Sequence, residues 1–228
     1  MHLEKIIDKW PSISSGKDID SRLEQPNQYD YTFILNAYGY KDDIERCLTA
    51  VQVQAHDTKF EIIAIDNGST DGTGDYLEEL ASSHENVTVV HCDHVLGDAA
   101  AKNIGIKLST GKYIIILDAS SEITGDICSV VSEAFASNQH LGLLGPFGLK
   151  SDDMQHFHEE VESGLADAMQ GYCMIFPRGI ISNTGLMREC FRFYRNLDID
   201  YSFQIKDLNM QIIADNRIPI TRHKHRQW

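Results

Sequence analysis

Short runs of branched apolar residues recur along the chain, and segments with helical spacing separate them. The runs lie at residues 31–35, 60–65, 87–90, 113–117 and 141–144. Between them, apolar residues recur every three or four positions, as they do on the buried face of a helix. Strands that alternate with helices predict a parallel sheet covered by helices. We therefore expect an α/β fold.

The run at residues 113–117 constrains the function most, because Asp118, Ala119 and Ser120 follow it directly. A short, branched apolar run is typical of a strand buried on both faces of a parallel sheet. In open α/β sheets, ligands bind at the carboxyl ends of the strands. Asp118 is thus predicted to lie in a ligand site. The alternative is that Asp118 only caps the next turn or helix.

Polar residues also follow three of the other runs, at positions 36–38, 66–68 and 91–93. Right-handed crossovers bring the carboxyl ends of parallel strands to one edge of the sheet. These segments are therefore expected to meet beside Asp118 in one site. Residues 66–73 consist of turn-forming types, so a turn and a helix cap are an alternative that remains compatible with binding.

The balance of charge excludes some classes of partner. The chain has 228 residues, with 34 acidic against 20 basic, a net charge of −14. Nucleic acid is not expected as a partner, because phosphate affinity depends on clustered cations. No apolar run approaches the ~18 residues that span a bilayer, which still allows peripheral association with a membrane. Five cysteines without paired spacing indicate reduced thiols and a cytoplasmic location.

The second half is less regular. Residues 148–171 are polar and are expected to form a mobile loop with a helix, or a solvated face. Strands are predicted at residues 172–176 and 210–214, the latter as the last strand. Acidic residues predict that a helix begins near Asp198, and Asp42 or Asp43 is expected to cap the first helix of the sheet region.

Four segments, in this order and spacing, resemble the family 2 glycosyltransferases: residues 34–38, 61–73, 101–106 and 111–118. The resemblance implies the GT-A fold, with a Rossmann-like, mostly parallel central sheet flanked by helices and a smaller C-terminal acceptor-side region. Residues 1–28 would be an N-terminal extension. Residues 29–145 would be the nucleotide-sugar-binding half, and 146–228 the acceptor-side half of the same domain.

The resemblance also implies an activity. Such an enzyme transfers a sugar from a UDP- or GDP-linked donor to a hydroxyl of a sugar, lipid-linked or small-molecule acceptor, usually with inversion, in glycan, polysaccharide or glycolipid assembly. The residues that would bind the donor are Asn36, Ala37, Tyr38, Asp66, Asn67, Gly68, Asn103, Asp118, Ala119 and Ser120. The oligomeric state is not indicated by the sequence.

The chain departs from the family where the family has Asp-x-Asp, because Ser120 replaces the second acid. One anionic oxygen fewer should weaken a Mg²⁺ or Mn²⁺ site. Asp118, His223 and His225 are the candidate metal ligands, since some relatives carry a late histidine. Alternatively, the basic tail at residues 222–226 supplies the positive charge that a diphosphate leaving group needs, or it is a solvated chain end.

An inverting transfer needs a general base on the acceptor hydroxyl. By resemblance, Asp198 is the first candidate and Asp200 the second. Their alternative role is to complement the dipole at a helix N-terminus. Loss of the second acid also allows a non-catalytic GT-A module that binds nucleotide-sugars or regulates. A nucleotidyltransferase is disfavoured, because residues 36–41 form no glycine-rich, basic phosphate loop.

Overall fold

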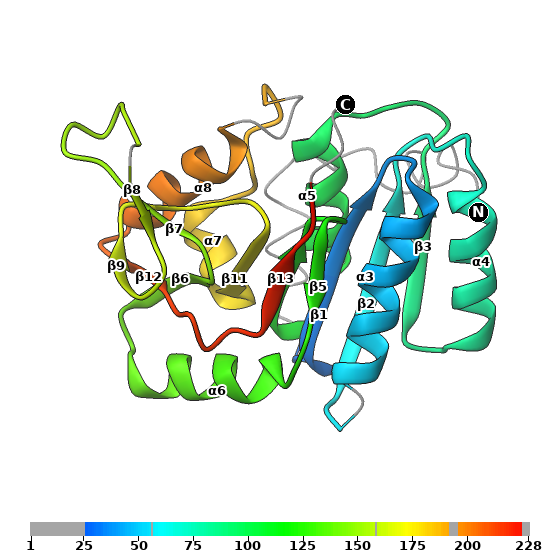
Figure 1. Ribbon diagram of the computed structural model, residues 1–228, viewed down its shortest axis with the longest axis horizontal. Helices are drawn as coiled ribbons and strands as arrows, with labels where there is room; N and C mark the ends of the chain where they lie inside the picture. The colour runs from blue at the N-terminus through cyan, green and yellow to red at the C-terminus, as the bar shows by residue number, and fades with distance from the viewer. Residues whose placement is uncertain (1–25, 56, 158, 192–195, 225–228) are drawn as a thin grey trace.

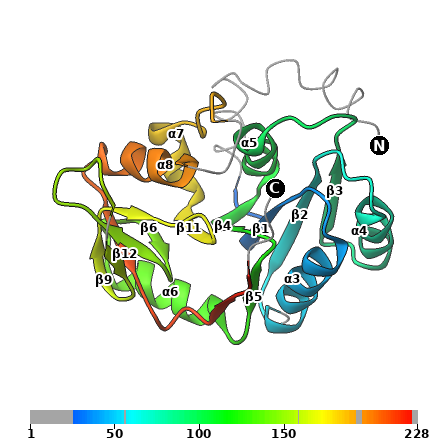
Figure 2. The same ribbon diagram turned by 45° about the horizontal axis from the view of Figure 1, so that its top comes forward.

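The computed structural model describes residues 26–55, 57–157, 159–191 and 196–224. One eight-stranded sheet crosses these residues in the order β3-β2-β1-β4-β11-β6-β12-β9. Helices cover both of its faces (Figures 1 and 2). The sheet is thus continuous through both expected halves of the chain.

The first half alternates strands and helices as predicted. Its elements are β1 (Tyr29–Ala37), α3 (Lys41–Gln54), β2 (Phe60–Asp66), α4 (Thr73–Ser83), β3 (Val87–His91), α5 (Asp98–Leu108) and β4 (Gly111–Leu117). All four strands run parallel, and Ile34 at the centre of β1 lies opposite Ile63 on one side and Ile116 on the other. Every residue of β2 is buried, as expected for a strand covered on both faces.

Two apolar cores lie on opposite faces of this sheet. Ile34 packs in the core with α5, α7 and α8, whereas its neighbour Phe33 packs in the core with α3 and α6. Alternate side chains of a strand point to opposite faces, so each strand contributes to both cores. Gly105 of α5 lies so near β1 that a Cβ there would be 2.5 Å from Ile34 Cγ2.

The second half extends the sheet. Its elements are β5 (Ser121–Ile123), α6 (Ile127–Ser137), β6 (Leu141–Gly145), β7 (Gly148–Lys150), β8 (Glu159–Val161), β9 (Gly164–Ala166), β10 (Ala168–Met169), β11 (Cys173–Pro177), η1 (Arg178–Ile180), α7 (Ile181–Thr184), α8 (Leu197–Lys206), β12 (Gln211–Ala214) and β13 (Ile220–Arg222). β11 runs antiparallel to β4 and to β6. The expected boundary after residue 145 falls at the end of β6, but the sheet crosses it.

Three sequence expectations are wrong. The described residues of 148–171 form the short strands β7 to β10 in place of a loop with a helix, while many of them are exposed, as the alternative of a solvated face predicts. Strands of two or three residues are too short to show a period in the sequence. The residue before α3 is Tyr40, in a left-handed conformation, and the Lys41 N–H donates to Asp71 Oδ2 at 3.1 Å. A distant loop therefore caps this helix in place of Asp42 or Asp43. Finally, β12 is not the last strand.

The last described strand, β13, pairs antiparallel with β5, which lies directly after the Asp118 turn. Beyond β13, the His223 N–H donates to the Ser120 carbonyl at 2.8 Å. Residues 220–223 are therefore not a solvated end but lie against the predicted site (Figure 1). In the part of the chain that the structure describes, no helix has the length and hydropathy needed to cross a bilayer.

Candidate functional site

The carboxyl ends of β1, β2 and β4 meet at one edge of the sheet, as predicted. The Asn67 N–H, just after β2, donates to the Ala37 carbonyl at the end of β1 at 2.8 Å. On the other side of β1, β4 ends at Leu117, and Asp118 follows. The expected polar segments therefore lie side by side.

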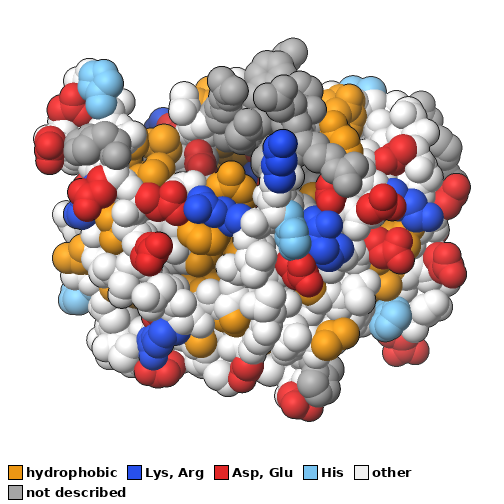
Figure 3. Space-filling view, in the orientation of Figure 1, with side chains coloured by type: hydrophobic (Ala, Val, Ile, Leu, Met, Phe, Trp, Pro, Cys, Tyr) orange, Lys and Arg blue, Asp and Glu red, His pale blue; other side chains and the backbone are white. Residues whose placement is uncertain are grey.

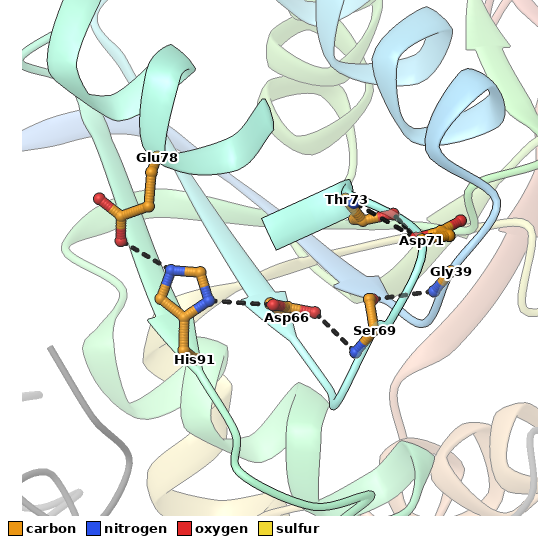
Figure 4. A network of polar contacts seen from close by, with 7 residues as sticks. All are labelled: Gly39, Asp66, Ser69, Asp71, Thr73, Glu78 and His91. Atoms are coloured by element: carbon orange, nitrogen blue, oxygen red, sulfur yellow. Dashed lines mark hydrogen bonds and ion pairs between the residues drawn. The ribbon is translucent and has the colours of Figure 1, made fainter. Parts of the chain in front are cut away.

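Asp66 is held from two sides (Figure 4). Its Oδ1 accepts the Ser69 N–H at 3.0 Å, and its Oδ2 lies 2.9 Å from His91 Nδ1. The other nitrogen of His91, Nε2, lies 2.6 Å from Glu78 Oε1 on α4. The Asp66 side chain is only 9% exposed, so its direction is fixed by these contacts.

The rest of the 66–73 loop is held by Asp71. Its Oδ1 accepts from Thr73, and its Oδ2 accepts the Lys41 N–H. Burial raises the pKa of Asp71, but the hydrogen bonds from Thr73 and Lys41 outweigh this and lower it. The Gly39 N–H donates to Ser69 Oγ at 2.9 Å, which joins this loop to the loop after β1 (Figure 4).

The remaining donor candidates of the first half differ in exposure. Tyr38 is 39% exposed at the rim, whereas Ala37 is buried. Asn67 is buried and accepts the Leu96 N–H, so it braces the loop before α5. Gly68 has a φ of +81°, which disfavours any side chain at this turn.

Asn36 and Asn103 both bond within the protein. Asn36 Nδ2 donates to Asp98 Oδ1 at 2.9 Å. Asn103 is fully buried, and its amide exchanges hydrogen bonds with the backbone of Met187. Asn103 therefore connects α5 to residues 187–189. Its side chain has no exposed surface that could contact a nucleotide-sugar.

Asp118 begins a closed turn. Its Oδ1 accepts from the Ser120 N–H at 2.8 Å and from Ser120 Oγ at 2.5 Å. The Asp118 N–H donates to the Tyr172 carbonyl, and Ser121 Oγ donates to the same carbonyl. Ser120 therefore orients the Asp118 carboxylate where the family has a second acid.

The tail adds basic groups beside this turn. His223 Nε2 lies 2.5 Å from Glu122 Oε2. The Arg222 guanidinium stacks 4.1 Å from the Phe147 ring centroid and pairs with Glu160 at 2.9 Å. Figure 3 accordingly shows basic and acidic side chains interspersed over β5 and β13.

The described residues contain no preformed cluster of metal ligands. No group of three or more His, Cys, Asp or Glu side chains is arranged around a metal position within the described residues. His225 lies outside the described residues. Asp118 and His223 flank the same turn, and Glu122 holds His223 as a carboxylate often holds a ligating imidazole. Such an oxygen and nitrogen pair suits Mn²⁺, with phosphate oxygens and water as further ligands.

Sequence reasoning missed a buried cation at the site. Lys102 Nζ of α5 lies 2.7 Å from Asp98 Oδ2, and these side chains are 11% and 14% exposed. Burial lowers the pKa of Lys102, but the charges of Asp98, Asp118 and Asp198 outweigh it and raise the pKa. Lys102 thus interacts with carboxylates from both halves. The only signal in the sequence was its place in the 101–106 segment.

The two candidate bases have different surroundings. Asp198 Oδ2 accepts the Gly171 N–H at 2.8 Å, and burial raises the pKa of Asp198 although Lys102 opposes this. Asp200 Oδ1 instead lies 2.6 Å from Arg188 Nη1, and its Oδ2 accepts from Gln204. Asp198 is therefore buried with a raised pKa, whereas Asp200 is held in an ion pair with Arg188.

This architecture is that of a GT-A glycosyltransferase: a mostly parallel sheet whose strand ends carry Asp66 and Asp118, extended by further strands and by helix α8, which carries Asp198. The sequence profile described as glycosyl transferase family 2 matches residues 32–199. The chain belongs to that family.

Similar proteins agree with this assignment. The glycosyltransferase AglE of Haloferax volcanii is 34% identical over 86 residues, which cover 37% of this chain and 28% of AglE. The structure of GalNAc-T7 with UDP, GalNAc and Mn²⁺ superposes with a TM-score of 0.74 at 14% identity, over 86% of this chain and 44% of that one.

A second solved structure is the mannosyltransferase PcManGT from Pyrobaculum calidifontis, in complex with GDP-Man and Mn²⁺. It superposes with a TM-score of 0.66 at 17% identity, over 95% of this chain and 66% of that chain. Both of these proteins share the fold of this chain at low sequence identity. The AglE match spans little more than a quarter of that relative's length.

Proposed function

We propose that this protein transfers a sugar from a UDP- or GDP-linked donor to an acceptor hydroxyl, with inversion. The observation that carries the proposal is the position of Asp66 and Asp118 at strand ends on either side of β1, in a chain that matches the glycosyltransferase family. The direction of the pKa shift of Lys102, to which Asp118 and Asp198 both contribute, is consistent with a candidate base on the same side of the sheet. Donor-bound structures of the same fold, with UDP or GDP-Man, support the class of donor.

The donor would bind along the strand ends. The carboxylate of Asp66 accepts an N–H of the base or a ribose hydroxyl, and Tyr38 lines the rim. Asn67 and Gly68 keep the loop in place. At the other end of the site, Asp118, oriented by Ser120 and followed by Ala119, faces the diphosphate.

A divalent cation fits this charge balance. Lys102 provides one positive charge among the carboxylates of Asp98, Asp118 and Asp198, so the cluster is net negative before an anionic diphosphate arrives. Asp118 and His223 would hold Mn²⁺ or Mg²⁺ together with the phosphates. When bound, the cation neutralises the charge that develops on the leaving diphosphate.

The acceptor would be deprotonated by Asp198. Its raised pKa makes it a stronger base than an exposed aspartate, which suits proton abstraction from a hydroxyl. The configuration of the transferred sugar is inverted if the acceptor hydroxyl attacks that sugar from the side opposite the diphosphate. The acceptor is a sugar, a lipid-linked sugar or a small molecule in glycan, polysaccharide or glycolipid assembly, and a lipid-linked one would require peripheral contact with a membrane.

A cytoplasmic location is part of this proposal. The described cysteines, which include all five of the chain, are free thiols, and four of them are buried. Free thiols persist in a reducing compartment. UDP- and GDP-linked donors would have to be present in the same compartment.

Calorimetry with UDP, GDP and their sugars, with and without Mn²⁺, tests the donor site. Binding of one nucleotide family, tightened by Mn²⁺, is expected, and absence of binding to all of them contradicts the proposal. A second candidate is a non-catalytic nucleotide-sugar-binding or regulatory module, favoured by the Ser120 hydroxyl in place of an acid. Donor binding without turnover, unchanged in Asp198→Asn, would indicate that module.

A further inference from the structure

His91 is the last residue of β3 and lies beside the end of β2. Its ring bridges two carboxylates of different elements: Asp66 at the end of β2, at 2.9 Å, and Glu78 on α4, at 2.6 Å (Figure 4). The Asp66 side chain is 9% exposed and the Glu78 side chain is 57% exposed. The buried partner of His91 is therefore the proposed donor-binding carboxylate.

Both ring nitrogens face an acceptor, which limits the protonation states of the ring. The doubly protonated ring donates to both carboxylates. A neutral ring has one N–H only, and the nitrogen without it would face a carboxylate with a lone pair. Glu78 can turn into water because it is exposed, whereas Asp66 cannot. In either charge state, the favoured arrangement keeps the proton on Nδ1, where it donates to Asp66.

The first turn of α4 leaves space for this pair. A Cβ at Gly74 would lie 2.8 Å from Asp66 Oδ2 and 3.6 Å from His91 Cε1. Any larger residue would displace the carboxylate from the ring. The backbone N–H of Ser69 holds the other oxygen of Asp66 at 3.0 Å, so the two donors together fix the plane of the carboxylate.

We propose that His91 is a positioning residue: it holds Asp66 in the orientation that accepts an N–H of the donor's nucleobase. This inference rests on the proposed function and deepens it. The ligand class is a nucleoside diphosphate whose base carries a ring N–H, as uracil and guanine do. His91 acts through Asp66 and touches no substrate itself.

The test compares two substitutions of His91. In His91→Asn, the side-chain amide can place an N–H where Nδ1 lies, so binding of UDP or GDP should stay within about threefold of the unsubstituted protein. His91→Leu removes the donor, and binding should weaken about tenfold or more, as expected for a lost hydrogen bond to a charged group. His84→Leu, at the far end of α4, is the matched control and should bind normally.

Inorganic pyrophosphate with Mn²⁺ separates positioning from general damage to the site. His91→Leu should bind pyrophosphate like the unsubstituted protein, because only the base contact is lost. Equal weakening of pyrophosphate and nucleotide, or nucleotide binding unchanged in His91→Leu, overturns the role of His91 and leaves the proposed function intact. If the unsubstituted protein binds no nucleoside diphosphate, the proposed function fails, and the role of His91 fails with it.

Discussion

Lys102 Nζ lies 2.7 Å from Asp98 Oδ2, and both side chains are almost inaccessible to water. Asp98 also accepts from Asn36 at the end of β1. The ion pair lies within α5, Asp98 joins it to the sheet edge through Asn36, and the positive charge of Lys102 acts on Asp118 and Asp198. An uncharged residue at either position would leave a buried charge without its partner.

Lys102→Met should destabilise the fold by about 3 kcal/mol, because removal of one member of a buried ion pair strands the other. Chemical denaturation measures this loss. The double variant Asp98→Leu with Lys102→Met should recover part of it, since no charge is then left buried. Lys112→Met, on the exposed surface of β4, is the control and should change stability little. Equal effects of Lys102→Met and Lys112→Met would contradict the prediction.

Asp198→Asn should lower kcat by about a hundredfold or more, the usual range for loss of a general base. The fold should persist, because an amide oxygen can still accept the Gly171 N–H. Transfer assays with a responsive acceptor measure the effect. Asp200→Asn is the matched control two positions further along α8, and its loss of the Arg188 ion pair should cost far less activity. A reversed ranking would assign the base to Asp200.

The same substitution should stabilise the protein at neutral pH. Burial raises the pKa of Asp198 above its ordinary value of 3.8, so the folded state binds this proton more tightly than the unfolded state. The contribution of Asp198 to stability is thus present below about pH 4 and is lost as the pH rises through the raised pKa. Thermal denaturation of Asp198→Asn at several pH values should show its advantage at pH 7 and not at pH 3.

Ser120→Asp restores the second acid of the family motif and should tighten Mn²⁺-dependent binding of the nucleotide. Without metal, the new carboxylate loses the hydrogen bond to Asp118 and repels it, so the melting temperature in EDTA should fall. Ser120→Asn, of similar size and without charge, is the control. Calorimetry measures nucleotide binding by both variants with and without Mn²⁺. If Mn²⁺ tightens binding no more in Ser120→Asp than in Ser120→Asn, the result argues against a metal at Asp118.

Gly105→Ala should destabilise the protein by about 1–2 kcal/mol. The new Cβ would lie 2.5 Å from Ile34 Cγ2 and 3.1 Å from Ile65 Cδ1, and overpacking of this kind outweighs the better helix propensity of alanine. Denaturation curves give the difference. Gly179→Ala, where a Cβ meets nothing within 4 Å, should be tolerated. A neutral Gly105→Ala would show that α5 can move away from β1.

The first half of the fold was predictable because three of its four strands, β1, β2 and β4, are long and mostly buried on both faces. Branched runs such as residues 113–117 have no other stable location, and the turn residues after β2 mark the strand end unambiguously. The predicted placement of Asp66 and Asp118 at strand ends on one edge of the sheet is confirmed, with β1 between the two strands. The strands of residues 148–169 escaped prediction because their pairing with one another and with β12, rather than local pattern, decides their structure.

The partners of the site residues could not be read from the sequence. His91 lies in an expected polar segment, but nothing local indicates that its ring reaches Asp66, 25 positions earlier. In the sequence, Lys102 looks like an ordinary surface residue of an amphipathic helix. Only the fold shows that it pairs with Asp98 and is influenced by the charges of Asp118 and Asp198. The location of carboxylates follows from strand ends, whereas their pairing depends on side-chain directions set by tertiary packing.

The pairing of β5 with β13 bears on how the protein is made. During translation, Ser121–Ile123 emerge from the ribosome long before Ile220–Arg222. The strand β5 therefore has no β13 to pair with while most of the second half is synthesised. Until then the turn at Asp118 lacks its backbone bond to His223. A nascent chain therefore completes the backbone hydrogen bonds around the Asp118 turn only after residue 223 has emerged from the ribosome.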